Sequence, residues 1–132
     1  MHKLSFGLRV LLGLIFIGTA LGKFTGSMDS MRDQLEIASW FWLVIAAIEL
    51  VGGVGLLVSL WAGRLALPFG LLFVAFMFGA VVSHIRVDDP VSAMTMPVAL
   101  FLLSLVVSGI ELRQAGPLHT GIASRYRGAD EV

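Results

Sequence analysis

Four long apolar runs, separated by short polar segments, dominate the hydrophobic pattern of the chain. Residues 65–83 and 90–110 contain no charge, and residues 37–63 are interrupted only by Glu49. The first run is shorter, because only residues 10–22 lack charge, so its helix has to extend beyond both ends. A hydrocarbon core about 30 Å thick needs about 20 apolar helical residues. The pattern therefore predicts four transmembrane helices. The predicted spans are 5–26, 37–62, 65–84 and 91–112.

The segments between these spans are too short to form a separate domain. We therefore expect an all-α fold, with residues 1–113 forming one four-transmembrane-helix bundle. Residues 114–132 show no helical periodicity and contain glycines and charges. They are predicted to form a flexible cytoplasmic tail.

Polar residues near the ends of the runs indicate where the helices begin. Ser30 and Asp33 fit a capping box, which predicts that the second helix starts before the membrane and enters it near residue 37. Asp89 and Pro90 are typical of an N-cap and a first helical residue. Pro97 either kinks the fourth helix or marks its true start, and the sequence leaves both alternatives open.

Composition agrees with a membrane protein and excludes several other classes. The chain is 58% hydrophobic and 14% charged, with a mean hydropathy of +0.94, whereas soluble domains are about a quarter charged. Its formal net charge of zero gives no electrostatic footprint for nucleic acid. The absence of cysteine excludes disulfides and thiol redox chemistry within this chain. The three histidines are dispersed along the sequence, so no metal site is predicted.

The distribution of basic residues predicts the orientation of the bundle. Four spans place both termini on the same side, and that side also carries the turn near residue 64. The terminal side has six Lys and Arg and the other side has three. The positive-inside rule therefore places both termini in the cytoplasm. The six are Lys3, Arg9, Arg64, Arg113, Arg125 and Arg127, and the three are Lys23, Arg32 and Arg86.

Small residues are expected to hold the helices together, because lipid tails are as apolar as the helices themselves. Gly18, Gly22 and Gly26 form two overlapping G-x-x-x-G steps at the end of the first span. We expect these glycines to pack the bundle internally. A seam between copies in a homo-oligomer is the alternative.

Glu49 is the first candidate for chemistry, because it lies near the middle of the second span. An ionisable side chain at this depth costs several kcal/mol and marks a functional site by default. Helical spacing places Trp42, Ala46, Gly52 and Leu56 on the same face. The small neighbours indicate that another helix covers the carboxyl, so Glu49 is expected to face protein. The alternative is a neutral, hydrogen-bonded packing carboxyl.

Three basic side chains are expected at the outer end of the bundle, above Glu49. Lys23 ends the first span, and His84 and Arg86 end the third. With Glu49 they are candidates for a ligand-binding or proton-relay site, although Lys23 could also snorkel to the head groups and His84 could be an ordinary interfacial residue. Arg9 and Glu111 lie at the cytoplasmic end instead. We expect them to form a structural ion pair.

Three segments resemble the DoxX-like family of small bacterial membrane proteins. The first runs from Arg9 to Phe16 and on to Gly22-Lys23-Phe24. The second is Ile48 to Leu56, in which Glu49 is followed by a glycine pair, and the third is Gly79 to Arg86, which ends in a His-x-Arg turn. The resemblance covers roughly residues 6–110. It singles out Arg9, Lys23, Glu49, His84 and Arg86.

The resemblance implies a multi-pass protein of the bacterial inner membrane. Members of this family are associated with membrane oxidoreductase assemblies, including a thiosulfate:quinone oxidoreductase subunit, and a distant animal relative is a receptor-assembly chaperone. We therefore expect a redox-linked subunit that binds a quinone or small anion near the outer face. Because the chain lacks cysteine, no cofactor is expected to be built in, and electron transfer needs a bound quinone or a partner protein. The alternatives are a non-catalytic assembly or scaffold subunit and a small proton-coupled transporter.

Overall fold

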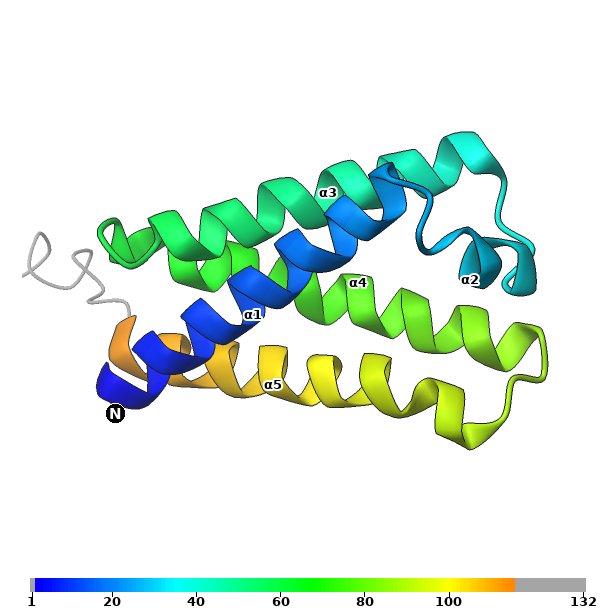
Figure 1. Ribbon diagram of the computed structural model, residues 1–132. Helices are drawn as coiled ribbons and strands as arrows, with labels where there is room; N and C mark the ends of the chain where they lie inside the picture. The colour runs from blue at the N-terminus through cyan, green and yellow to red at the C-terminus, as the bar shows by residue number, and fades with distance from the viewer. Residues whose placement is uncertain (1, 116–132) are drawn as a thin grey trace, which may run out of the picture.

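The computed structural model describes residues 2–115, which are helical apart from short connections (Figure 1). Four helices are long and apolar enough to cross a membrane, which confirms the predicted all-α four-helix bundle. The predicted tail lies outside the described residues from position 116 onward. The elements are α1 (His2–Phe24), α2 (Asp29–Gln34), α3 (Ser39–Val58), η1 (Gly63–Leu65), α4 (Ala66–Arg86) and α5 (Val91–Ala115).

The described chain begins and ends at the same end of the bundle. Figure 1 shows the N-terminus beside the last turn of α5, with the short helix α2 at the opposite end. We call these the terminal end and the α2 end. An even number of spans requires this arrangement, and the assignment of the terminal end to the cytoplasm stays a prediction from the basic residues.

Two glycines bring α1 and α3 into direct backbone contact. A Cβ atom on Gly53 would lie 2.8 Å from the carbonyl oxygen of Gly13, so neither position has room for a side chain. The predicted packing role of Gly18 and Gly26 is wrong. Gly18 has nothing within 4 Å of a built Cβ, and Gly26 lies in the turn after α1 with φ +78°. Gly22 does pack closely, because a Cβ there would lie 2.9 Å from Sδ of Met28. The contact between α1 and α3 is made through small residues, but at Gly13 and Gly53.

The buried core joins all four long helices in the middle of the bundle. The rings of Phe16 and Phe73 stack in parallel with their centroids 3.6 Å apart, and both are fully buried. A Cβ on Gly52 would meet the Phe73 ring, so this glycine makes room for the aromatic pair. The other members of this cluster are Leu12, Leu56, Met77, Leu100 and Val107.

The helix starts differ from the predictions at two places. Residues 29–34 form the separate helix α2, which has no side-chain cap, and α3 begins only at Ser39. The predicted continuous second helix is therefore wrong, because Glu36 takes a positive φ of 52° that interrupts the helical path. Pro97 lies inside α5, which removes the alternative that it starts the helix. α5 begins at Val91, one residue after Pro90.

Candidate functional site

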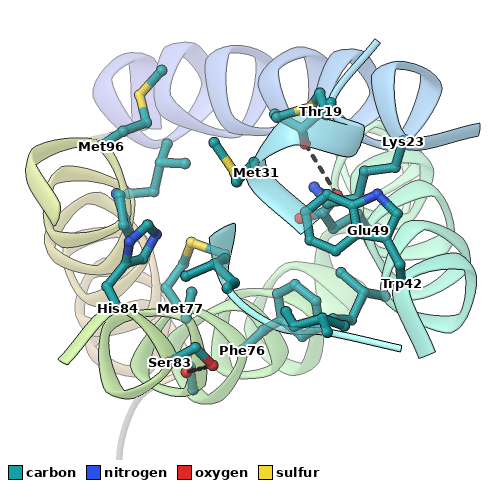
Figure 2. A pocket seen from close by; sticks show the side chains of 18 of the residues that line it. Thr19, Lys23, Met31, Trp42, Glu49, Phe76, Met77, Ser83, His84 and Met96 are labelled. Atoms are coloured by element: carbon teal, nitrogen blue, oxygen red, sulfur yellow. Dashed lines mark hydrogen bonds and ion pairs between the residues drawn. The ribbon is translucent and has the colours of Figure 1, made fainter. Parts of the chain in front are cut away.

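A cavity of about 360 Å³ lies among the four long helices, toward the α2 end (Figure 2). Its volume falls within the usual range of small-molecule pockets. Helices α3, α4 and α5 supply most of its wall, and Thr19 and Lys23 of α1 complete it. The segment around α2 contributes Met28, Met31 and Leu35, so this segment covers the cavity.

Most of the cavity wall is apolar and adaptable. Four of the six methionines of the chain line it, and their unbranched thioether side chains adjust to ligands of different shape. Phe41 and Phe76 add flat aromatic surface. Such a wall favours an apolar ligand. The four methionines are Met28, Met31, Met77 and Met96.

The first polar group on this wall is a buried ion pair between α1 and α3. The Nζ atom of Lys23 lies 2.7 Å from Oε2 of Glu49, and the two side chains are only 6% and 5% exposed. The Oγ1 atom of Thr19 lies 3.2 Å from the same carboxylate oxygen. The contact between Gly13 and Gly53 brings the two helices close enough for this pair.

The indole ring of Trp42 packs against the ammonium group of Lys23. The distance from Nζ to the ring centroid is 4.9 Å, which is a cation–π contact. Trp42 is buried on the same face of α3 as Glu49, as its helical spacing from Glu49 predicts. Its Nε1 atom has no hydrogen-bond partner among the described residues. The ring thus contacts Lys23 through its π face, and its buried N–H donor is not used by these residues.

The second polar group on the wall is His84, near the end of α4. Its Nδ1 atom lies 2.6 Å from Oδ2 of Asp89, and both side chains are buried. The other oxygen of Asp89 accepts a hydrogen bond of 2.5 Å from Gln34 of α2. The bonds from Gln34 and His84 favour the ionised carboxylate and hold the pKa of Asp89 below its ordinary value of 3.8. Asp89 thus joins the cavity wall to the segment that covers the cavity.

Arg86 does not reach the cavity. Its guanidinium donates a hydrogen bond of 2.6 Å to the backbone carbonyl of Leu35, just after α2. Arg86 therefore fastens the covering segment to α4, and it is absent from the residues that line the cavity. The expected group of three cations above Glu49 is wrong in this respect, because only Lys23 and His84 face the cavity.

Arg9 and Glu111 lie at the terminal end, away from the cavity. The Nε atom of Arg9 is 3.9 Å from Oε1 of Glu111, and both side chains are 11% exposed. Ser5 also donates a hydrogen bond to Glu111, and Arg9 donates one of 2.9 Å to the carbonyl of Ser59. These contacts join α1, α5 and the end of α3.

Sequence reasoning missed three residues of the site, which are Thr19, Gln34 and Asp89. Gln34 and Asp89 lie outside the long helices, where no periodicity shows which way a side chain points. Asp89 was interpreted as a helix cap, but its two oxygens bind His84 and Gln34 instead. Thr19 could have been found, because it lies one helical turn before Lys23 on the same face.

Comparison with known proteins identifies the family. The sequence profile of the DoxX-like family matches residues 7–107. The chain belongs to the DoxX-like family. This match confirms the resemblance seen in the three segments around Lys23, Glu49 and His84. No solved structure matches the chain.

A curated relative of this DoxX-like chain comes from Bacillus subtilis (strain 168). It is named "Putative oxidoreductase CatD", and it is 37% identical over 78 residues. The aligned part covers 58% of this chain and 55% of the relative. The match thus spans about half the length of the relative, and the name describes that protein.

Proposed function

We propose that this DoxX-like protein is the membrane subunit of an oxidoreductase assembly and that its cavity binds the headgroup of a quinone. The observation that carries the proposal is the buried Lys23–Glu49 pair on the wall of an otherwise apolar cavity. An ionisable pair at this depth is costly to maintain and is typical of a functional site. The name of the Bacillus subtilis relative supports the same class of function.

The charges around the cavity favour a quinone over a small anion. Both basic side chains on its wall already have a carboxylate partner, Glu49 for Lys23 and Asp89 for His84. An anion would have to compete with these carboxylates in an apolar environment. A quinone is neutral, its flat ring suits the methionine and aromatic wall, and its carbonyl oxygen can accept a hydrogen bond from the Lys23 ammonium.

Lys23 and Glu49 would carry a proton to or from the bound ring. A quinone that takes up two electrons also takes up two protons, one on each oxygen. The electrons come from the cofactor of a partner subunit, since this chain has no cysteine. The Lys23–Glu49 pair supplies one of the two protons, because it is the polar group that contacts the ring at the α3 wall.

The location of this site follows from the predicted orientation. With both termini in the cytoplasm, the α2 end and the cavity lie near the outer face of the bacterial inner membrane. Quinones are dissolved in the same bilayer, so a ligand can reach the bundle from the lipid. The proposed partner subunit then docks from the outer side or within the membrane.

A cavity-blocking variant tests this proposal. Ala80 lines the cavity, and Ala80→Phe fills it with a ring. Ala99→Phe is the matched control, because Ala99 is exposed on α5 and does not line the cavity. Quinone is extracted from each purified protein and quantified, and 2,3-dimethyl-1,4-naphthoquinone is then titrated into each protein in nanodiscs.

We expect wild-type protein and Ala99→Phe to retain quinone and to bind the added naphthoquinone. Ala80→Phe should lose both properties while keeping its helix content. Wild-type protein that neither retains nor binds a quinone would contradict the proposal. In that case a stably bound membrane protein that is lost in Glu49→Gln would support the assembly role instead.

A further inference from the structure

The wall opposite Glu49 carries a polar side chain that the proposed proton route does not use. In Figure 2, His84 lies on one side of the cavity, and Glu49 and Lys23 lie on the other, with Met31 and Met77 between them. His84 lines the cavity and its side chain is 7% exposed. The cavity therefore presents polar groups on two opposite sides of an apolar middle.

Asp89 fixes the His84 ring so that one nitrogen is left for a ligand. Its carboxylate can only accept a hydrogen bond, so the 2.6 Å contact places a proton on Nδ1 of His84. The Nε2 atom is then the ring nitrogen that remains for the ligand. Gln34 binds the other oxygen of Asp89 and holds the carboxylate in place.

We infer that His84, positioned by Asp89, is a second polar contact for the ligand, and that the ligand is a ring with oxygen atoms on two opposite edges. A para-quinone and its quinol belong to this class. The inference rests on the proposed function and narrows its ligand. It also gives Asp89 a role as a positioning residue.

The chemistry of imidazole suits both forms of such a ligand. Protonated His84 donates a hydrogen bond from Nε2 to a carbonyl oxygen, and neutral His84 with its proton on Nδ1 accepts one from a hydroxyl group. When the quinone takes two electrons from the partner cofactor, each ring oxygen gains one proton. The Lys23–Glu49 pair supplies one proton and Nε2 of His84 supplies the other, which leaves His84 neutral and the Asp89 carboxylate unchanged.

Two ligands and one variant test the contact. 2,3-Dimethyl-1,4-naphthoquinone has two opposite carbonyls, whereas 1-tetralone has a similar fused frame with one. At a pH where Nε2 of His84 also carries a proton, we expect His84→Phe to weaken binding of the dione about tenfold, the value of one lost hydrogen bond from a charged donor. Binding of 1-tetralone should change by less than about twofold, because its single oxygen stays at Lys23. Titrations use the full chain in nanodiscs.

Equal losses for the two ligands, or an unchanged affinity for the dione, would overturn the inference. A failure of this kind is distinct from a failure of the proposed function. If Ala80→Phe abolishes binding of the dione but His84→Phe does not weaken that binding, the proposed quinone site stands and the second contact at His84 is wrong. If wild-type protein does not bind the dione, both are wrong.

Asp89→Ala provides a second test that keeps the His84 ring in the protein. Nitrogen NMR of ¹⁵N-histidine-labelled protein reports which ring nitrogen carries the proton, with the His84 signal assigned by its loss in His84→Phe. We expect neutral His84 to hold its proton on Nδ1 in wild-type protein and to lose this preference in Asp89→Ala, which has no acceptor for that proton. The affinity for the dione should fall several-fold in the same variant. Absence of either effect would overturn the role given to Asp89.

Discussion

The two ends of the bundle each contain an ion pair, but among the residues that the structure describes only the pair at the α2 end is fully buried and lines a cavity. Lys23 of α1 meets Glu49 of α3 toward the α2 end, and Arg9 of α1 is 3.9 Å from Glu111 of α5 at the terminal end. The side chains of both pairs are almost completely buried. Opposite charges and low exposure therefore do not by themselves distinguish a functional pair from a structural one.

The two ion pairs differ in whether protein side chains or an unfilled cavity lie beside them. At the terminal end, Ser5 and Ser59 bind Glu111 and Arg9 directly, and neither charged residue lines the cavity. At the α2 end, Thr19 contacts the carboxylate, but the remaining side faces about 360 Å³ of space that protein does not fill. Unfilled space beside a buried charge is the feature that indicates a ligand.

The largest expected effect is on stability, from removing one charge of the cavity pair. Lys23→Met leaves the carboxylate of Glu49 without its cation and should lower the free energy of unfolding by about 3 kcal/mol. The double variant with Glu49→Leu removes both charges and should recover most of this loss, because apolar side chains replace a buried pair at little cost. SDS unfolding in mixed micelles measures the three proteins. A double variant as unstable as Lys23→Met would contradict this interpretation.

The next effect tests the helix contact that brings the cavity pair together. Gly53→Ala places a methyl group 2.8 Å from the Gly13 carbonyl oxygen, where only backbone movement can relieve the overlap. We expect a loss of about 2 kcal/mol and weaker quinone binding, because α1 shifts relative to α3. Gly18→Ala is the control, since nothing lies within 4 Å of its built Cβ. The same SDS unfolding assay compares them, and equal stability of the two variants would contradict the proposed contact.

A smaller effect is expected at the terminal end. Glu111→Gln keeps the size of the side chain and an acceptor for Ser5, but it removes the charge that faces Arg9. We expect a loss of about 1 kcal/mol, because the pair is long and Arg9 keeps its bond to Ser59. Unfolding in mixed micelles measures this change. A loss as large as that of Lys23→Met would show that the two pairs are energetically alike.

The smallest effect concerns the mobility of the α2 segment that covers the cavity, which in wild-type protein should change only in acid. Hydrogen bonds from Gln34 and His84 lower the pKa of Asp89 in the folded protein below 3.8. The contact therefore stabilises the folded protein fully above pH 3.8, and this stabilisation is lost as the pH falls through the pKa that Asp89 has in the folded protein. A nitroxide on Ser30→Cys reports the motion of α2, and the absence of native cysteine makes the label specific. Mobility should rise only below pH 3.8, whereas Asp89→Ala should be mobile at pH 7. Equal mobility of the two proteins at pH 7 would contradict this contact.

The sequence predicts the spans well and the connections poorly. Charge-free runs of about 20 residues have one stable solution in a bilayer, so the four helices follow from length and hydropathy alone. The burial of Glu49 also follows, because Gly52 and Ala46 on its face require a neighbouring helix. Residues 25–38 have no such constraint, and their separate helix α2 depends on contacts made by Arg86 and Asp89 from distant parts of the chain.

The candidate site shows the same division. Lys23, Glu49 and His84 were found because helical depth and face place them at one end of the bundle. Arg86 was misplaced, because depth alone cannot show that its side chain turns toward the carbonyl of Leu35. The cavity itself depends on how α2 and α5 pack, which no local sequence pattern describes.

A paired titration of two isosteric variants compares the two ends of the bundle for ligand binding. Glu49→Gln and Glu111→Gln each replace one buried carboxylate by an amide of the same shape, and 2,3-dimethyl-1,4-naphthoquinone is titrated into both in identical nanodiscs. We predict that Glu49→Gln weakens binding at least about tenfold, while Glu111→Gln binds like wild-type protein. Equal affinity of the two variants would contradict the assignment of the quinone site to the Lys23–Glu49 pair.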